Sequence, residues 1–152
     1  PRAVEAMIQD KVRLSAEVCG PRLVYPNGKI QHVGVGFAPG VAIPHHFNHY
    51  EPSSLHARVS GYCQAITGAA MLIDSELFWE LEGFDEIFSF CYEDTDFCLR
   101  AAAIGKKILC SQTVDSIHLE GQTRNETSMR YQNLSAEIFV ARWGGRVSSL
   151  SA

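Results

Sequence analysis

The sequence predicts an α/β fold in which helices cover a sheet. Short apolar segments with strand character alternate along the chain with segments whose apolar residues recur at helical spacing. The 152 residues are 46% hydrophobic and 20% charged, a composition that suits a single domain, residues 1–152, with a packed core. Ligand sites in such folds lie at the carboxyl ends of strands and at helix starts. The acidic residues 93–96 fall at a junction of this kind.

The first half of the chain is expected to form a helix, a hairpin and a long loop. Val4, Met7 and Ile8 recur at helical spacing and would line one face of the helix. Residues 26–29, Pro-Asn-Gly-Lys, predict a tight turn, because Asn-Gly tolerates the left-handed backbone of hairpins. The expected elements are a helix over residues 3–14, a strand over 17–25 that bends at Gly20-Pro21, a returning strand over 30–37 and a long loop over 38–60.

The second half is expected to alternate strands and helices. Gly105 suits the end of a helix, because glycine tolerates the positive φ that helix ends adopt. The expected elements are a strand over 61–73, helices over 77–81 and 94–104, a strand over 107–110, and a helix from Tyr131 to Trp143 that Gly144-Gly145 ends. The large apolar residues interpreted as core are Leu77, Trp79, Leu81, Phe84 and Trp143.

The charge and the cysteine content of the sequence limit the functional classes to which the protein could belong. The net charge of −4 is spread along the chain without a basic stripe, which argues against nucleic acid as the main partner. No apolar run approaches the roughly 20 residues of a membrane-spanning helix. The five cysteines are odd in number and lack a C-x-x-C pair, so we expect reduced thiols in a reducing compartment. The chain opens at Pro1 directly into a helical segment, which indicates a piece of a longer protein.

The acidic residues Glu93, Asp94 and Asp96 have two interpretations. The macrodipole favours carboxylates in the first turn of a helix, so these residues could simply cap it, with Asp96 and Arg100 as a surface ion pair at i,i+4. Alternatively, an ionised carboxylate at a helix start could act as a general base toward a hydroxyl nucleophile. Asp94 and Asp96 have the D-x-D form of a metal motif. Two residues apart in a helix, however, they point in different directions, and we do not expect a metal clamp.

Histidines and a glycine supply further candidates. His118 follows a strand and could be a ligand or a hydrogen-bonded structural residue. His45, His46 and His49 resemble a metal-binding tract, but they lack cysteine partners and lie in an irregular segment, which favours a solvated loop. Gly68, in the segment Thr67-Gly68, could let a ligand approach the backbone closely, or could belong to a tightly packed strand.

An ordered set of motifs over nearly the whole chain resembles the C-terminal half of the catalytic domain of family 2 glycosyltransferases. It is similar in particular to the bacterial rhamnosyltransferase-like enzymes with a GT-A fold. The matching segments, in chain order, are Gly20-Pro21-Arg22-Leu23 with Tyr25-Pro26, Ile30-Gln31-His32, Thr67-Gly68-Ala69, Gly83-Phe84-Asp85-Glu86, Glu93-Asp94 with Asp96, Cys98 and Arg100, His118 with Glu120-Gly121, and Arg142-Trp143-Gly144.

The resemblance implies an inverting transfer of a sugar from a nucleotide-sugar donor to an acceptor hydroxyl. By resemblance, Asp94 is the general base that deprotonates the acceptor, and Glu93 orients the acceptor or a neighbouring loop. His118 matches a histidine that helps hold a divalent cation, Mg²⁺ or Mn²⁺, on the donor diphosphate. The residues expected to contact substrate are Thr67, Gly68 and Asp96.

One half of the GT-A fold is missing from this sequence. In the family, a nucleotide-binding half with its own D-x-D motif precedes the segment seen here, and residues 1–40 do not supply it. We therefore expect a partial GT-A fold that is inactive alone and whose exposed sheet edges favour a homodimer. The implied partners are a nucleotide-sugar donor and a glycan or lipid-linked acceptor. The implied setting is bacterial cell-surface polysaccharide synthesis in the cytoplasm, with peripheral association of the parent protein at the inner membrane face.

Two functions of other classes stay open. The segment could be a non-catalytic interaction module that has retained a glycosyltransferase half-fold. It could also be a metal-dependent hydrolase whose ligands include Glu93, Asp96 and His118, which would require further clustered histidines or aspartates on strand ends. A zinc content near one ion per chain would favour the hydrolase.

Overall fold

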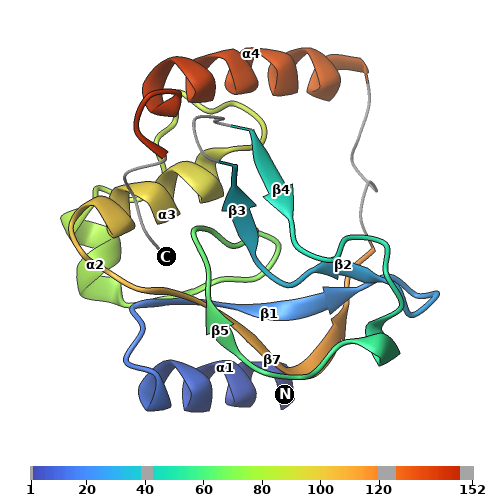
Figure 1. The fold of residues 1–152 in the computed structure, drawn as a ribbon. Helices are drawn as coiled ribbons and strands as arrows, with labels where there is room; N and C mark the ends of the chain where they lie inside the picture. Colours follow the sequence, from blue (N-terminus) through green and yellow to red (C-terminus); the bar gives the residue numbers. More distant parts are fainter. Residues whose placement is uncertain (1, 39–42, 120–125, 148–152) are drawn as a thin grey trace.

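A curled mixed sheet lies at the centre of the molecule, with helix α1 (Arg2–Arg13) on one face and helix α3 (Glu93–Ala103) on the other (Figure 1). The structure, a computed structural model, describes residues 2–38, 43–119 and 126–147, and for residues 126–129 it describes the backbone alone. Helix α4 (Glu126–Trp143) packs outside α3. The predicted arrangement of a mixed sheet flanked by helices is confirmed.

The sheet has the strand order β2-β1-β7-β5, and β6 pairs with the beginning of β1, whereas β2 pairs with its end. The long central strands β1 and β7 are parallel, and the short strands β2, β5 and β6 are antiparallel to them. The pairing of β1 with β7 shifts register after Pro21, at the place where the sequence predicts a bend, because proline offers no N–H to the ladder. The bounds are β1 Val18–Val24, β2 Ile30–His32, β5 Gly61–Tyr62, β6 Leu72–Ile73 and β7 Ile108–Ile117.

Alternating side chains of the two central strands face opposite layers. Cys19 and Leu109 belong to a buried cluster with Met7 of α1. Their neighbours along each strand, among them Val18 and Ile108, belong to the larger cluster that contains the sheet-facing side of α3. Burial on both faces explains why β1 is buried over its whole length.

None of the described helices is long and apolar enough to cross a membrane.

The segment predicted as one returning strand over 30–37 is two strands in different sheets. Gly34 adopts a φ of +112° and separates β2 from β3 (Val35–Phe37), which pairs with β4 (Pro44–His46) in a second, two-stranded sheet. The segment 38–60 therefore contributes β4 and, further on, the short helix η1 (Ser53–Leu55). Its residues 39–42 lie outside the described residues.

The strand predicted over 61–73 is wrong for most of its length. Only β5 and β6 at its two ends are strands, and residues 67–70 between them turn away from the sheet. The backbone amides explain the difference, because those of Thr67 and Gly68 donate to side chains, His32 and Asp94, instead of to a neighbouring strand. This turn becomes one wall of the pocket described below.

Two helices differ from the prediction in the apolar side chains that they bury. Helix α1 buries Met7, but Val4 and Ile8 are about half exposed. Helix α2 (Ser75–Glu80) buries Leu77, whereas Trp79, predicted as core, is 74% exposed, because a helix of six residues presents only one side to the sheet. Trp143 is buried, as predicted.

Candidate functional site

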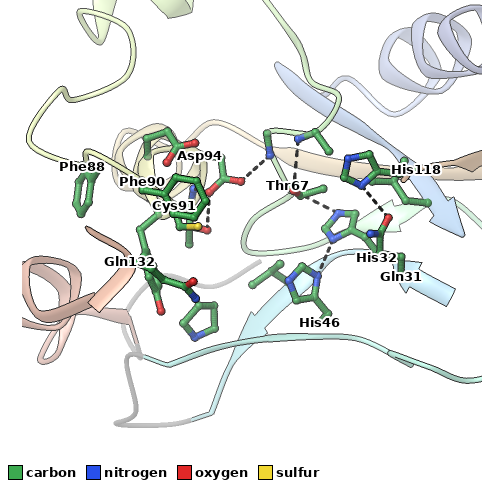
Figure 2. Close-up of a pocket in the computed structure, with 18 of the residues that line it drawn as sticks. Gln31, His32, His46, Thr67, Phe88, Phe90, Cys91, Asp94, His118 and Gln132 are labelled. Carbon is green, nitrogen blue, oxygen red and sulfur yellow. Dashed lines mark hydrogen bonds between the residues drawn. The ribbon is translucent and has the colours of Figure 1, made fainter. Parts of the chain in front are cut away.

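A pocket of about 600 Å³ opens where the turn 67–69, the start of α3 and the ends of β2 and β7 meet (Figure 2). Its opposite sides differ chemically, because carboxylates line the α3 side and histidines line the side near β2, β4 and β7. Five of the six predicted site residues line the pocket, namely Thr67, Gly68, Glu93, Asp94 and His118. The sixth, Asp96, does not.

Asp94 is fixed by three hydrogen bonds from the protein. Its Oδ2 accepts the Gly68 N–H at 2.5 Å, and its Oδ1 accepts the Thr95 N–H at 2.6 Å and the Thr95 hydroxyl at 3.1 Å. A side chain at position 68 would crowd this contact, since a Cβ built on Gly68 would lie 3.2 Å from the Cβ of Asp94. Oδ1 accepts an N–H of the first turn of α3, as the capping interpretation expects. Oδ2 instead connects the carboxylate to the pocket wall through Gly68.

The chain reaches Asp94 through a strained turn. Cys91 and Tyr92 both have left-handed backbone, with φ of 65° and 72°, and Tyr92 is the N-cap of α3. A non-glycine residue in this region costs on the order of 1–3 kcal/mol, and such residues concentrate at functional sites. Helix α3 begins directly after this turn, and its first two residues, Glu93 and Asp94, line the pocket.

Glu93 lies in a different environment from its neighbour. Its Oε2 is buried and has no hydrogen-bond partner among the described residues. Burial, followed by the adjacent charge of Asp94, raises the pKa of Glu93 above its ordinary value of 4.5. The two adjacent carboxyl groups therefore lie in unlike environments, one hydrogen-bonded and the other without a partner among the described residues.

The stability of the Glu93→Gln variant, relative to that of wild type, is expected to increase as the pH rises. Because the folded state raises the pKa of Glu93, the stability that its protonated form contributes is complete below the unfolded-state pKa and is lost as the pH rises through the folded-state pKa. Glutamine does not ionise, so the melting temperature of the variant relative to wild type should increase by a few degrees between pH 4 and pH 8. The exposed Glu80→Gln is the matched control, and a difference independent of pH would contradict the expectation.

His118 stands at the carboxyl end of β7, on the side of the pocket opposite Asp94. Its backbone N–H donates to the Val24 carbonyl at 3.2 Å. Its Nδ1 lies 3.0 Å from the amide oxygen of Gln31, which can only accept, so Nδ1 carries the proton and the lone pair of the neutral ring is on Nε2. Glu120 and Gly121, which follow His118 in the predicted motif, lie outside the described residues.

His32 also lines the pocket, although the sequence indicates it only as part of the predicted strand 30–37 and of a segment matched by resemblance. It is 1% exposed, its Nε2 accepts the Thr67 N–H at 3.4 Å, and its Nδ1 lies 3.0 Å from Nδ1 of His46. Burial, and then the nearby His46 and His49, lower the pKa of His32 to about 3, so the ring is neutral at physiological pH. The available signal in the sequence is that two polar residues, Gln31 and His32, interrupt the otherwise apolar segment 30–37.

His118 is the pocket residue that the resemblance implies as a ligand of a divalent cation. Over residues 2–38, 43–119 and 126–147, no three His, Cys, Asp or Glu side chains are grouped so as to hold a metal ion. His118 presents a lone pair and fits a single ligand position. Mg²⁺ commonly completes its shell with waters and substrate phosphates. The hydrolase would need a larger group of ligands, which Glu93, Asp96 and His118 do not form.

Asp96 is buried, which corrects the expectation of a surface ion pair. Its exposed fraction is 0%, and it accepts hydrogen bonds from Arg100 Nε at 2.7 Å, Arg142 Nη1 at 3.0 Å and Trp143 Nε1 at 2.8 Å. Arg100 also donates to the Leu81 carbonyl. Asp96 therefore connects the first turn of α3 to the end of α4 and to the segment after α2, and it points away from Asp94, as the helical spacing predicts.

Comparisons with known proteins found two similar chains. The protein is 29% identical over 134 residues to the O-antigen biosynthesis protein RfbC of Myxococcus xanthus, over 82% of this chain and 10% of that protein. It is also 29% identical over 112 residues to the uncharacterized protein y4gI of Sinorhizobium fredii (strain NBRC 101917 / NGR234), over 69% of this chain and 12% of that protein. The chain thus spans about a tenth of the length of these relatives. No protein-family profile matches it.

Proposed function

We propose that this chain forms the acceptor side of a family 2 glycosyltransferase, with the C-terminal part of a GT-A fold. The reaction is an inverting transfer of a sugar from a nucleotide-sugar donor to an acceptor hydroxyl. The observation that carries the proposal is the placement of the Asp94 carboxylate in the pocket wall, where the backbone of Gly68 holds it. An oriented carboxylate at a pocket wall is what a general base for a hydroxyl nucleophile requires.

The residues of the pocket take separate roles in this proposal. Asp94 receives the proton of the acceptor hydroxyl on a lone pair that its three hydrogen bonds leave available. Glu93, whose pKa is raised by burial and by the charge of Asp94, orients the acceptor from the same helix turn. Thr67 and Gly68 lie beside the transferred sugar. A divalent cation, held in part by His118, would neutralise charge on the leaving diphosphate when it is bound.

The similarity to the Myxococcus xanthus protein supports a role in polysaccharide biosynthesis. In that setting the partners are a nucleotide-sugar donor and a glycan or lipid-linked acceptor, and the chemistry takes place in the cytoplasm near the inner membrane face. The donor half of the site would come from sequence other than this chain. The proposal therefore includes that this chain alone does not turn over donor.

The test compares this chain with a longer polypeptide that contains it. Each is incubated with UDP- and dTDP-sugars, Mg²⁺ or Mn²⁺, and a panel of glycan acceptors, and nucleoside diphosphate release is followed by chromatography. The proposal expects release only from the longer polypeptide, dependent on the cation and accelerated by an acceptor. A folded longer polypeptide that consumes none of the donors, with any acceptor of the panel, would overturn it.

A further inference from the structure

His32 connects the two sides of the pocket through hydrogen bonds. On one side of its ring, Nε2 accepts the Thr67 N–H at 3.4 Å, and on the other, Nδ1 meets Nδ1 of His46 at 3.0 Å. The next residue after Thr67 is Gly68, whose N–H donates to Asp94. Figure 2 shows these contacts in sequence, from His46 through His32 and the 67–68 turn to Asp94.

The partners of His32 fix its tautomer. A backbone N–H can only donate, so Nε2 of His32 must be the acceptor and the proton of the neutral ring must lie on Nδ1. That Nδ1–H then donates to Nδ1 of His46. Only 1% of the residue is exposed, and a buried ring nitrogen that loses its hydrogen-bond partner is energetically costly.

The turn that His32 holds has little freedom to move without moving Asp94. The Gly68 N–H lies 2.5 Å from Asp94 Oδ2, and the space beside the Gly68 Cα is already filled by the Asp94 side chain. The neighbouring amide, that of Thr67, makes its hydrogen bond to His32 alone among the described residues. A displacement of the Thr67 amide would therefore also displace the adjacent Gly68 N–H and the Asp94 carboxylate bonded to it.

We propose that His32 is a positioning residue for the proposed transfer reaction. As the Nδ1–H tautomer it holds the 67–68 turn, and the turn orients the Asp94 carboxylate toward the acceptor. The inference rests on the proposed function for its effect on rate. We call the hydrogen bonds from the Thr67 N–H to His32 and from the Gly68 N–H to Asp94 the relay. The relay does not depend on the proposed function and can be measured separately.

The relay is tested by NMR on this chain. Wild type should show one histidine with a protonated Nδ1 and an unprotonated Nε2 that stays neutral down to about pH 4, and the Gly68 amide proton should resonate far downfield because it donates to a carboxylate. His32→Gln places an amide oxygen near the position of Nε2 and should keep the Gly68 shift. His32→Asn places its amide near Nδ1, loses the contact with Thr67, and should move the Gly68 resonance upfield. His46→Ala removes only the other partner and should keep the shift.

The rate is tested with the same variants in the longer polypeptide. His32→Asn should lower kcat by about 10²-fold with KM nearly unchanged, because a misplaced catalytic group slows chemistry more than binding. His32→Gln should recover most of that loss. His45→Asn, an exposed histidine that does not line the pocket, is the matched control.

The outcomes separate this inference from the proposed function. A Gly68 resonance that is unchanged in His32→Asn, or that moves equally in His46→Ala, would overturn the relay whether or not the protein transfers sugar. An intact relay with transfer that is equally fast in wild type and His32→Asn would overturn the positioning role. Intact NMR signatures with no transfer by any variant would contradict the proposed function, and with it the effect on rate, while the relay would stand.

Discussion

Replacing Asp94 by Asn in the longer polypeptide is expected to reduce sugar transfer by about 10²–10⁴-fold, the range typical of losing a general base. Asparagine has nearly the shape of aspartate, and its amide oxygen can still accept the N–H of Gly68. It cannot take a proton from an acceptor hydroxyl. The loss should appear in kcat, measured as nucleoside diphosphate release at saturating donor and acceptor. The amide NH2 group of asparagine would face the Thr95 N–H that now donates to Oδ1, so we also expect a lower melting temperature, and the rates are compared at a temperature where both proteins are folded.

Two comparisons decide whether Asp94 is the base. Asp74→Asn changes an aspartate that pairs with Lys11 and does not line the pocket, and its rate should match wild type. Glu93→Gln tests the neighbouring carboxylate, whose raised pKa makes it the competing candidate. Equal rates for Asp94→Asn and wild type, together with a large loss in Glu93→Gln, would assign the proton transfer to Glu93 and contradict the role given to Asp94.

The parts of the fold that follow from local chemistry could be predicted from the sequence. Helix α3 begins within one residue of the prediction and ends before Gly105, which has a φ of +79°. The tight turn before β2 contains Gly28 with a φ of +78°. In each case the decisive residue acts on its own backbone, so no knowledge of distant segments is needed.

The errors fall where a distant partner decides the structure. The segment around Thr67 and Gly68 is apolar and resembles a strand, but its amides bond to His32 and Asp94, which lie 35 and 26 residues away in the sequence. Likewise, the spacing of Asp96 and Arg100 predicts an ion pair but cannot show that α4 covers it. Local propensity gives way in both cases to contacts that only the folded chain creates.

The candidate site shows the same division. Glu93 and Asp94 could be found because their place at a helix start is encoded locally, and His118 because it follows a strand. His32 could not be assigned to the pocket, since its contact with the turn at Thr67 joins residues that lie 35 positions apart in the sequence. The polar residues Gln31 and His32 interrupt an otherwise apolar segment, and polar side chains buried in this way require hydrogen-bond partners that the sequence does not name.

Asp96→Ala is expected to cost about 3–5 kcal/mol of stability, the range for removing one partner of a buried ion pair. The carboxylate is fully buried and accepts hydrogen bonds from Arg100, Arg142 and Trp143. Its removal leaves the indole N–H and a guanidinium N–H without their acceptor in the interior, and the desolvation cost of each is no longer compensated. The free energy of unfolding from urea titration measures the effect.

The control for Asp96 is the other carboxylate that Arg142 contacts. Asp85 pairs with Arg142 at 2.8 Å, but it lies nearer the surface, so Asp85→Ala should cost only about 1 kcal/mol or less. If the two variants lose equal stability, the buried contacts with Trp143 and Arg100 contribute nothing beyond an exposed ion pair.

The larger loss expected for Asp96→Ala should also loosen α4, because the Asp96 side chain joins the end of that helix to the helix turn that carries Glu93 and Asp94. Faster amide exchange in α4 would show that the carboxylate next to the candidate base acts by holding two helices together.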